Sequence, residues 1–295
     1  MRILYATDGG DPAINAGLMV ERVANPDNVE ITTLTVASDA FLGYLDSSAS
    51  ESVYENRDRA EQAARVAAHR LREQGYETES KVAYGDPAAE IVSEVGSGSY
   101  DLTVMGTGVS TWVDRVLLGS VSTAVLHASP SSVLIVHRDP LESPEGIKLL
   151  LGADGSDHAA RAEEMIRRFA DPSRCRVKVL SVAEEPREPI TFAPTAFGYH
   201  HVPHKVTQAA RDELIEKAEI VAERAAASLK HAGFAVDWEG ILGHPKTDLL
   251  REAAAGLFDL VVVGSRGLSP IQRVVLGSVS DHVVRHAPGS LVVRA

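Results

Sequence analysis

Cysteine is almost absent from this sequence, and aromatic residues are few. The chain of 295 residues contains a single cysteine, Cys175, and only 5% of its residues are Phe, Trp or Tyr. One thiol excludes an internal disulfide and is typical of a reducing compartment. Cys175 has no paired histidine or second cysteine that would suggest nucleophilic or redox chemistry, so we expect a buried or idle thiol.

Long hydrophobic runs and an excess of positive charge are lacking as well. No apolar run reaches the roughly 18–20 residues of a membrane-spanning helix, so we expect no membrane span. Residues 1–8 form a strand-like run without the basic head and cleavage site of a secretory signal, which favours a cytoplasmic protein. The formal net charge of −12 argues against binding to nucleic acid or to an anionic membrane. An anionic ligand would therefore depend on local backbone amides and helix dipoles.

What the sequence does contain is an internal repeat. Residues 100–122 resemble residues 258–280 at an offset of 158. Near the start of each half the offset is 146, because Asp8 aligns with Asp154. The difference between 158 and 146 places an insertion of 12 residues in the second half. Repeats of this length are two copies of a domain rather than solenoid units.

Each copy consists of apolar runs of strand length that alternate with segments of helical periodicity. This alternation predicts a parallel sheet with right-handed crossovers. We therefore predict an α/β fold of two tandem flavodoxin-like, Rossmann-like domains, 1–138 and 147–295, joined by a charged Pro/Gly linker. Each domain is expected to have a five-stranded parallel sheet in the order 3-2-1-4-5, flanked by helices. The expected strands are 3–7, 29–37, 78–83, 101–105, 132–137, 147–152, 176–183, 235–241, 259–263 and 290–294.

The most informative stretch follows the buried strand expected at 259–263. The apolar run ends in Gly264 and Gly267, which permit the positive φ and close backbone approach of a ligand-binding turn. Gly277 and Ser278 precede a helix, and Ser278 is expected to be its N-cap. Free N–H groups at a helix N-terminus bind phosphate well. The spacing matches neither the G-x-G-x-x-G dinucleotide motif nor the Walker loop, and it predicts a strand, a phosphate-binding loop and a helix N-terminus.

An aspartate ends the first strand of each copy, Asp8 in the first and Asp154 in the second. Two interpretations stay open: a turn or N-cap residue, or a carboxylate that accepts a hydrogen bond from a ribose hydroxyl or a base edge. Ligands of open parallel sheets bind beyond the carboxyl ends of the strands, where the winding direction changes. If the first and fourth strands flank that point, Asp154 and the Gly264 loop meet in one crevice.

These residues resemble the universal stress protein family, whose nucleotide-binding motif is G-x2-G-x9-G-[ST]. The second copy matches the motif in full, and the resemblance covers essentially the whole chain in two copies. In ATP-binding members the strand-1 aspartate and a strand-2 valine surround the adenosine, and the glycine loop and following serine hold the phosphates. The resemblance implies ATP, with AMP or ADP as alternatives and Mg²⁺ riding on the phosphates. The implied site residues are Ala153, Asp154, Val182, Val263, Gly264, Arg266, Gly267, Gly277, Ser278, Val279 and Ser280.

The first copy departs from this motif. Its loop has Gly106 at the first position, but Val109 replaces the second glycine and Gly108 replaces the arginine. A β-branched residue resists positive φ and puts two methyl groups where a phosphate would approach. Nucleotide binding by this copy stays open. The candidate residues that it keeps are Thr7, Asp8, Val36, Gly106, Gly108, Gly119, Ser120, Val121 and Ser122.

The insertion lies within 184–204 and is rich in proline and aromatic residues, so we expect a long irregular loop before the second helix. It is either a lid over the crevice or a decoration. His200, His201 and His204 fit exposed loop residues better than metal ligands, because no carboxylate or thiol stands at fixed spacing beside them.

The expected function is that of an ATP-binding, nucleotide-dependent regulator of a stress response, with an unknown protein partner and no catalytic residues. A nucleotide-independent scaffold is the alternative, and a slow ATPase is a weaker one. A nucleotidyl transferase or pyrophosphatase is disfavoured, because the motifs of those enzymes are absent. The resemblance further implies that the two copies pack as an intramolecular pseudo-dimer through strands 132–137 and 290–294. Further association into a homodimer stays open.

Overall fold

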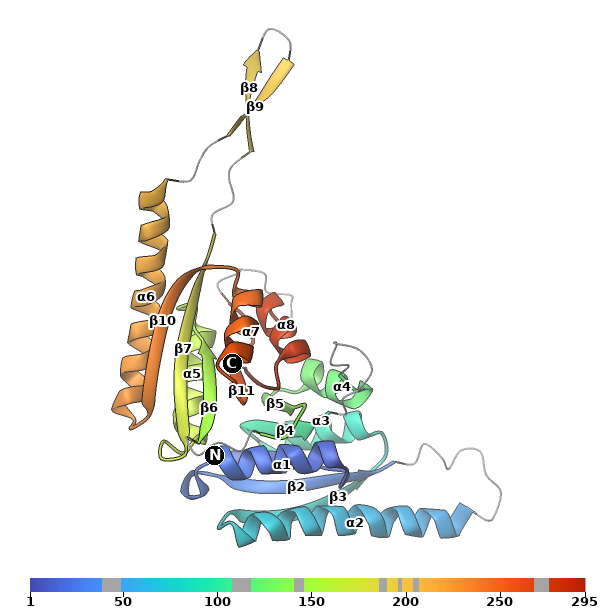
Figure 1. Cartoon of the computed structure of the whole chain (residues 1–295). Coiled ribbons are helices and arrows are strands. Elements are labelled where there is room, and N and C mark those ends of the chain that lie inside the picture. The colour runs from blue at the N-terminus through green and yellow to red at the C-terminus, as the bar shows by residue number, and fades with distance from the viewer. Residues whose placement is uncertain are drawn as a thin grey trace.

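One continuous sheet of ten strands runs through the molecule, in the order β10-β7-β6-β11-β12-β5-β4-β1-β2-β3 (Figure 1). The computed structural model describes residues 1–38, 49–107, 118–140, 146–185, 190–195, 198–203, 207–267 and 276–294. The first five positions of the sheet belong to the second repeat and the last five to the first repeat. Each repeat therefore has the strand order 3-2-1-4-5 that the sequence predicts.

The first repeat alternates strands and helices as expected, and its neighbouring strands are all parallel. Pro87 occupies the first turn of α3, and Asp86 caps that helix by accepting a hydrogen bond from the N–H of Ala89 at 2.9 Å. The elements are β1 (Arg2–Ala6), α1 (Asp11–Val23), a short 3-10 helix (Pro26–Asn28), β2 (Glu30–Ala37), α2 (Ala49–Glu73), β3 (Glu77–Tyr84), α3 (Pro87–Gly98), β4 (Leu102–Gly106), α4 (Ser120–Ala128) and β5 (Ser132–Val136).

The second repeat has the same succession, with one addition between its second strand and second helix. In the described ranges, no helix of either repeat is long and apolar enough to span a bilayer. The elements are β6 (Ile147–Gly152), α5 (Asp157–Phe169), β7 (Cys175–Glu184), β8 (Ile190–Thr195), β9 (Gly198–Pro203), α6 (Gln208–His231), β10 (Ala235–Gly243), α7 (Pro245–Ala255), β11 (Leu260–Gly264), α8 (Ser278–His286) and β12 (Gly289–Val293).

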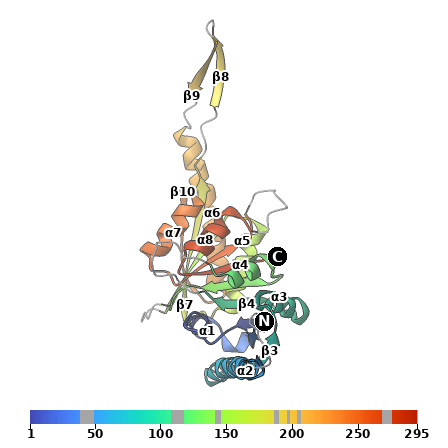
Figure 2. The same cartoon turned by 90° about the vertical axis from the view of Figure 1, so that its right-hand side faces the viewer.

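Alternate side chains of each central strand belong to opposite cores, as the two-residue period of a strand requires. In β1, Ile3 and Tyr5 pack into the core beneath α1, α2, α5 and α6. Leu4 of the same strand packs into the core beneath α3, α4, α7 and α8. Helices therefore cover both faces of the sheet (Figure 2), which explains why a central strand such as β11 is apolar on both sides.

The two repeats join through antiparallel pairing of their last strands, β5 and β12. Leu134 lies opposite Leu291, and every residue of both strands is buried. Bonds just beyond the strand ends extend the contact, because the N–H of His137 donates to the carbonyl of Pro288 at 3.0 Å. The pairing expected between 132–137 and 290–294 is confirmed, and it closes the sheet edge that each repeat would otherwise leave open.

A second contact joins the repeats directly after α1 and α5. Ala24 and Ala170, which align in the two repeats, form an antiparallel bridge. The N–H of Asn25 donates to the carbonyl of Phe169 at 2.9 Å, and the aligned Asp171 makes the reciprocal bond to the last residue of α1 at 2.8 Å. The two halves are therefore related by an approximate two-fold rotation.

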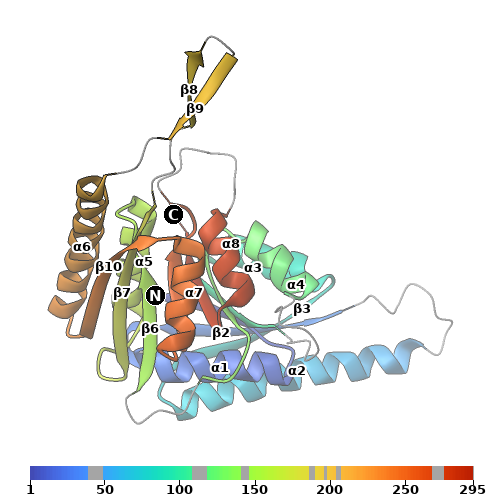
Figure 3. The same cartoon turned by 45° about the horizontal axis from the view of Figure 1, so that its top comes forward.

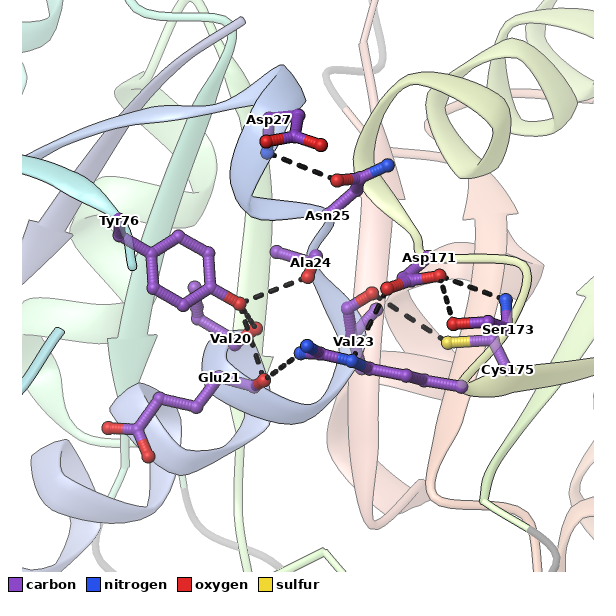
Figure 4. Close-up of polar contacts among 11 residues, drawn as sticks. Val20, Glu21, Val23, Ala24, Asn25, Asp27, Tyr76, Asp171, Ser173 and Cys175 are labelled. Carbon is purple, nitrogen blue, oxygen red and sulfur yellow. Dashed lines mark hydrogen bonds and ion pairs between the residues drawn. The ribbon is translucent and has the colours of Figure 1, made fainter. Parts of the chain in front are cut away.

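The turn that precedes β7 packs against the end of α1 (Figure 4). Arg174 Nη1 donates to the carbonyl of Glu21 at 3.1 Å, and Cys175 Sγ donates to the carbonyl of Val23 at 3.7 Å. Burial raises the pKa of Cys175 to about 12, so its thiol stays protonated. The expectation of a buried thiol is confirmed.

The insertion is not the irregular loop that its prolines predict, because β8 and β9 pair as an antiparallel sheet of their own. Residues such as Ile190 and Phe192 favour strands, and a two-stranded ribbon consists only of edges, where proline is tolerated. The hairpin extends away from the ten-stranded sheet, beyond the N-terminal end of α6 (Figure 3). The two roles predicted for the insertion, a lid over the crevice or a decoration, both stay predictions. His204 lies outside the described residues, and the side chains of His200 and His201 are not described.

Two glycines let helices approach strands closely. Gly106 ends β4 and Gly264 ends β11. A Cβ on Gly264 would lie 2.6 Å from the carbonyl carbon of His158 in α5, and one on Gly106 would overlap the carbonyl of Pro12 in α1. The first glycine of the motif is therefore required in both repeats by the packing of helix on strand, independently of any ligand.

Protonation of His137 is expected to weaken the junction between the repeats. Its Nε2 lies 2.8 Å from the carbonyl oxygen of Val284, and burial lowers its pKa from the usual 6.5. As the pH falls through 6.5, the unfolded chain binds this proton before the folded chain does. The free energy of unfolding should therefore decrease from there down to the lowered pKa, by about 1.4 kcal/mol for each unit of lowering.

Urea denaturation between about pH 7.5 and 5 measures this effect. His137→Phe should flatten the pH dependence relative to the unmodified chain. His231→Gln, which changes an exposed histidine, should keep it. An unaltered pH dependence in His137→Phe would contradict the expectation.

Gly264→Ala is expected to destabilise the fold by about 1–3 kcal/mol, the usual range for overpacking, because the new methyl group would meet the backbone of α5. Gly96→Ala is the control, since a Cβ there meets nothing within 4 Å. In an exposed helical position this change should stabilise by roughly 0.5–1 kcal/mol. Thermal and urea unfolding measure the stability of both variants. Equal stability of Gly264→Ala and the unmodified chain would refute the packing requirement.

Candidate functional site

The carboxyl ends of β6 and β11 lie side by side at the place where the sequence predicts the crevice of the second repeat. The two strands are adjacent and parallel, with Leu151 opposite Val262. Helix α5 packs on one face of the sheet and α7 and α8 pack on the other. The winding direction therefore changes between β6 and β11, where open parallel sheets bind ligands. Ala153 and Asp154 directly follow β6 at this point.

The carboxylate of Asp154 connects the turn after β6 with the glycine loop. Its Oδ1 accepts a hydrogen bond from the N–H of Ser156 at 3.0 Å, so the turn interpretation is confirmed. The N-cap of α5 is Ser156 rather than Asp154. A Cβ on Gly267 would lie 2.6 Å from Asp154 Oδ2. The structure therefore brings the two predicted residues together, and a side chain at position 267 would require the Asp154 carboxylate to move.

Helix α8 begins one residue earlier than predicted. Its N-cap is Gly277 instead of Ser278, and glycine has no side chain with which to cap the first turn. Gly277 takes this position because its N–H donates to the carbonyl of Ser265 at 2.7 Å, which fixes the direction of the loop. A Cβ there would lie 3.3 Å from the Cα of Arg266. A helix N-terminus without a side-chain cap is ready to bind an anion.

The side chains of two predicted contacts serve the protein itself. Ser280 is buried and its Oγ donates to the carbonyl of Gly264 at 2.7 Å, which ties the loop to α8. Val263 is buried in the core beneath α7 and α8. Ligand contacts at these two positions would therefore involve backbone groups.

The predicted adenosine contacts lie on adjacent strands at the same end of the sheet. Val182 is half-buried near the end of β7, next to β6. The N–H of Ala153 donates to the carbonyl of Leu180 at 3.0 Å, which holds the end of β6 against β7. Ala153 itself is buried. The structure thus places Val182, Ala153 and Asp154 along one edge of the crevice.

Basic groups gather at this crevice although the chain is acidic. Arg266 is half-buried within the glycine loop. Burial lowers the pKa of Arg294, and the charge of Arg266 lowers it further. The Arg294 guanidinium donates to the carbonyl of Leu126 in α4. The arrangement combines a carboxylate at one end with positive charge and free helix N–H groups at the other. It can hold a molecule with hydroxyl groups at one end and phosphates at the other.

His158, in the first turn of α5, lies next to the candidate site and is a residue that the sequence prediction misses. Its Nδ1 lies 3.4 Å from Oγ of Ser265. Burial lowers the pKa of His158 below its usual value, and nearby Arg266 lowers it further, while Asp154 opposes both. The aligned residue of the first repeat is Pro12. That difference between otherwise similar copies is the signal that could have identified it.

The first repeat builds a related but different crevice. Gly108 and Val109 lie outside the described residues, so the effect of this valine stays a prediction. Asp8 Oδ1 accepts from the N–H of Gly10 at 2.9 Å, the same turn as at Asp154. The N–H of Gly119 donates to the side-chain Oγ1 of Thr107 at 3.2 Å, where the second repeat uses a backbone carbonyl. Of the other candidates, Thr7 and Ser122 are buried, Val36 and Val121 are half-buried, and Ser120 is exposed.

Comparison with known sequences places both repeats in one family. The profile of the universal stress protein family matches residues 1–137 and 148–294. The universal stress protein YxiE of Bacillus subtilis is 29% identical over 136 residues, which cover 46% of this chain and 90% of the relative. The universal stress protein Rv2005c of Mycobacterium tuberculosis is 27% identical over 217 residues, which cover 72% of this chain and 68% of the relative.

A solved structure shares the whole arrangement. The crystal structure of a universal stress protein from Archaeoglobus fulgidus matches with a TM-score of 0.69 at 21% identity, covering 99% of this chain and 98% of the other. The tandem α/β fold is therefore common to the two proteins. Because the family profile matches each repeat over nearly its whole length, the chain belongs to the universal stress protein family.

Proposed function

We propose that the second repeat binds an adenine nucleotide, with ATP as the expected ligand, and that the chain acts as a nucleotide-dependent regulator of a stress response in the cytoplasm. One observation carries this proposal: the loop glycine Gly267 lies so close to Asp154 that a Cβ would come within 2.6 Å of its Oδ2. A carboxylate next to a loop glycine, beside a helix N-terminus that has glycine as its N-cap, suits a ribose followed by phosphates.

Each part of the site would hold one part of the nucleotide. Oδ2 of Asp154 would accept a hydrogen bond from a ribose hydroxyl, while Oδ1 keeps its bond within the turn. Val182 on β7 would line the side of the adenine. The first N–H groups of α8 and the guanidinium of Arg266 would hold the phosphates. In this arrangement Asp154 orients the ribose, so we propose binding rather than turnover.

The number of phosphates and the metal are further parts of the proposal. AMP and ADP would make the same base and ribose contacts as ATP and would lose those of the terminal phosphates. Mg²⁺ would be coordinated mainly by the phosphates, because no group of three His, Cys, Asp or Glu among the described residues is placed to hold a metal ion.

A scaffold that works without nucleotide is the second candidate function. The continuous sheet that joins the repeats and the altered loop of the first repeat favour it. A protein partner would then recognise the fixed arrangement of the two halves. Slow ATP hydrolysis is a weaker alternative, in which His158 would be the nearest group to move a proton.

Gly267→Val is expected to weaken nucleotide binding strongly, because the side chain would displace the Asp154 carboxylate and block the approach of a phosphate. Losing a hydrogen bond to a charged group costs about 1.5–3 kcal/mol, which corresponds to a roughly 10–100-fold rise in Kd. Isothermal titration calorimetry with ATP, ADP and AMP measures the change.

The aligned position of the first repeat supplies the matched variant. Val109→Gly restores the motif there and should add a second class of sites while the affinity of the second repeat stays the same. Unaltered binding by Gly267→Val would refute the assignment to the second repeat. Absence of binding by the unmodified chain would favour the scaffold.

Nucleotide binding is also expected to tighten as the pH falls. The pKa of His158 is lowered from 6.5 in the free protein, so its imidazole is neutral at pH 7. A bound phosphate is negative and would raise that pKa, so binding should take up a proton and gain affinity from about pH 7.5 to 6. Calorimetry in buffers of different ionisation enthalpy measures the number of protons that the complex takes up on binding. His158→Gln should lower the number of protons taken up, and an equal number in this variant would show that another group is responsible.

A further inference from the structure

A cavity of about 430 Å³ lies between α1 and α2 of the first repeat, two helices on the same face of the sheet (Figure 1). Helix α1 lines it with Ile14, Gly17 and Glu21, which recur at helical spacing. Helix α2 contributes one face of its own between Arg59 and Leu71. The volume falls within the usual range for small-molecule sites, about 300–1,000 Å³.

The walls of this cavity are largely apolar and partly open to water. Tyr5, Ala67 and Leu71 line its interior. Ile14 and Val66 also line it, and they are 39% and 59% exposed. Since burial of apolar surface contributes about 25 cal/mol per Å², an apolar molecule that covered these side chains would gain affinity from them.

Polar side chains line the rest of the cavity, and they are those of Thr7, Asp8, Glu21, Arg59, Gln62 and Arg70. At the end of α1, Arg70 Nε lies 2.6 Å from Oε1 of Glu21, whose side chain is only 10% exposed. At the start of α1 stands Asp8. Burial raises the pKa of Tyr5 to about 12 and its hydroxyl donates to the carbonyl of Ala13 at 2.6 Å. The phenol group of Tyr5, which also lines the cavity, is therefore uncharged.

The second repeat carries larger residues at the equivalent positions. Glu163 stands where the first repeat has Gly17, and Val221 stands where it has Ala63. The alignment holds in space, because a Cβ on Gly9 would meet Ala63 at 3.2 Å, and a Cβ on its counterpart would meet Val221 at 3.3 Å. Gly17 and Ala63 are therefore small in the first repeat only.

We propose that this cavity binds an uncharged amphipathic small molecule, with an aromatic or aliphatic body and one hydroxyl or amine group. The body would cover Ile14 and Val66, and the donor group would reach the carboxylate of Asp8 at the mouth. A nucleoside triphosphate fits poorly here, because Arg70 is already paired with Glu21.

The two repeats would then hold ligands of different chemistry. Asp8 lines this cavity and is also a candidate residue of the nucleotide position that the resemblance implies for the first repeat. In this proposal the cavity ligand takes Asp8, so nucleotide would bind to the second repeat alone. Binding in the cavity does not depend on nucleotide binding by the second repeat, because none of its described lining residues belongs to that repeat.

Fluorescence of 1-N-phenylnaphthylamine, an uncharged aromatic amine, tests this site in the full chain. We expect saturable binding at one site per chain. Ala67→Leu would fill the groove, and Val66→Arg would introduce the residue that the second repeat carries as Arg224. Each change should weaken dye binding by about tenfold or more. Val66 is exposed, so Val66→Arg should leave the fold intact even if Ala67→Leu does not, and thermal unfolding checks both.

Ala225→Leu is the matched control, because Ala225 aligns with Ala67 and both pack, half-buried, against the same core. It should bind the dye as the unmodified chain does, and excess ATP should not displace the dye. The proposal fails if the unmodified chain shows no saturable binding, if binding survives both substitutions in the cavity, or if Ala225→Leu loses it equally. Displacement by ATP would also overturn the proposal, because the cavity would then be the base end of a nucleotide site.

Discussion

The antiparallel ladder between β5 and β12 fixes the positions of the two halves, and the rest of the structure is arranged around it. Each of these strands is apolar and buried along its whole length, so either one left at an open edge would invite pairing with another chain. Their mutual pairing satisfies both edges at once. The bridge between Ala24 and Ala170 then holds the first helices of the two repeats together on one face of the sheet.

Close packing explains part of what looks like a ligand motif. Gly106 and Gly264 each end a strand against the backbone of a helix, so both repeats need glycine there whatever they bind. Gly267 is different, because what lies beside it is the carboxylate of Asp154. One motif therefore combines a glycine that the packing of the fold requires with a glycine that lies beside the candidate site, and only the second is altered in the first repeat.

Much of the fold could be predicted from periodicity and from the repeat, because buried parallel strands and amphipathic helices leave strong local patterns. The meeting of Asp154 with the glycine loop followed from the strand order alone. The β8–β9 hairpin could not be predicted, since its pairing overrides the local signal of Pro194 and Pro203. The start of α8 depends on the direction of the loop at Gly277, which no propensity encodes.

Residues whose roles come from tertiary contacts were also beyond the reach of the sequence. His158 belongs to the site because α5 packs against the end of β11, and the groove between α1 and α2 exists because small residues on two distant segments face each other. Neither feature has a local pattern. Both become visible when the two repeats are compared position by position.

The covalent link between the halves has an evolutionary consequence. In a symmetric homodimer every substitution appears twice, so one site cannot be changed while the other is kept. Here the strands of the junction are encoded separately, and a short connection holds the halves at a high effective concentration, of the order of millimolar for flexible linkers. One half can therefore carry Val109 in place of a glycine or a groove at Gly17, while its partner half keeps the full motif and continues to supply the other side of the sheet.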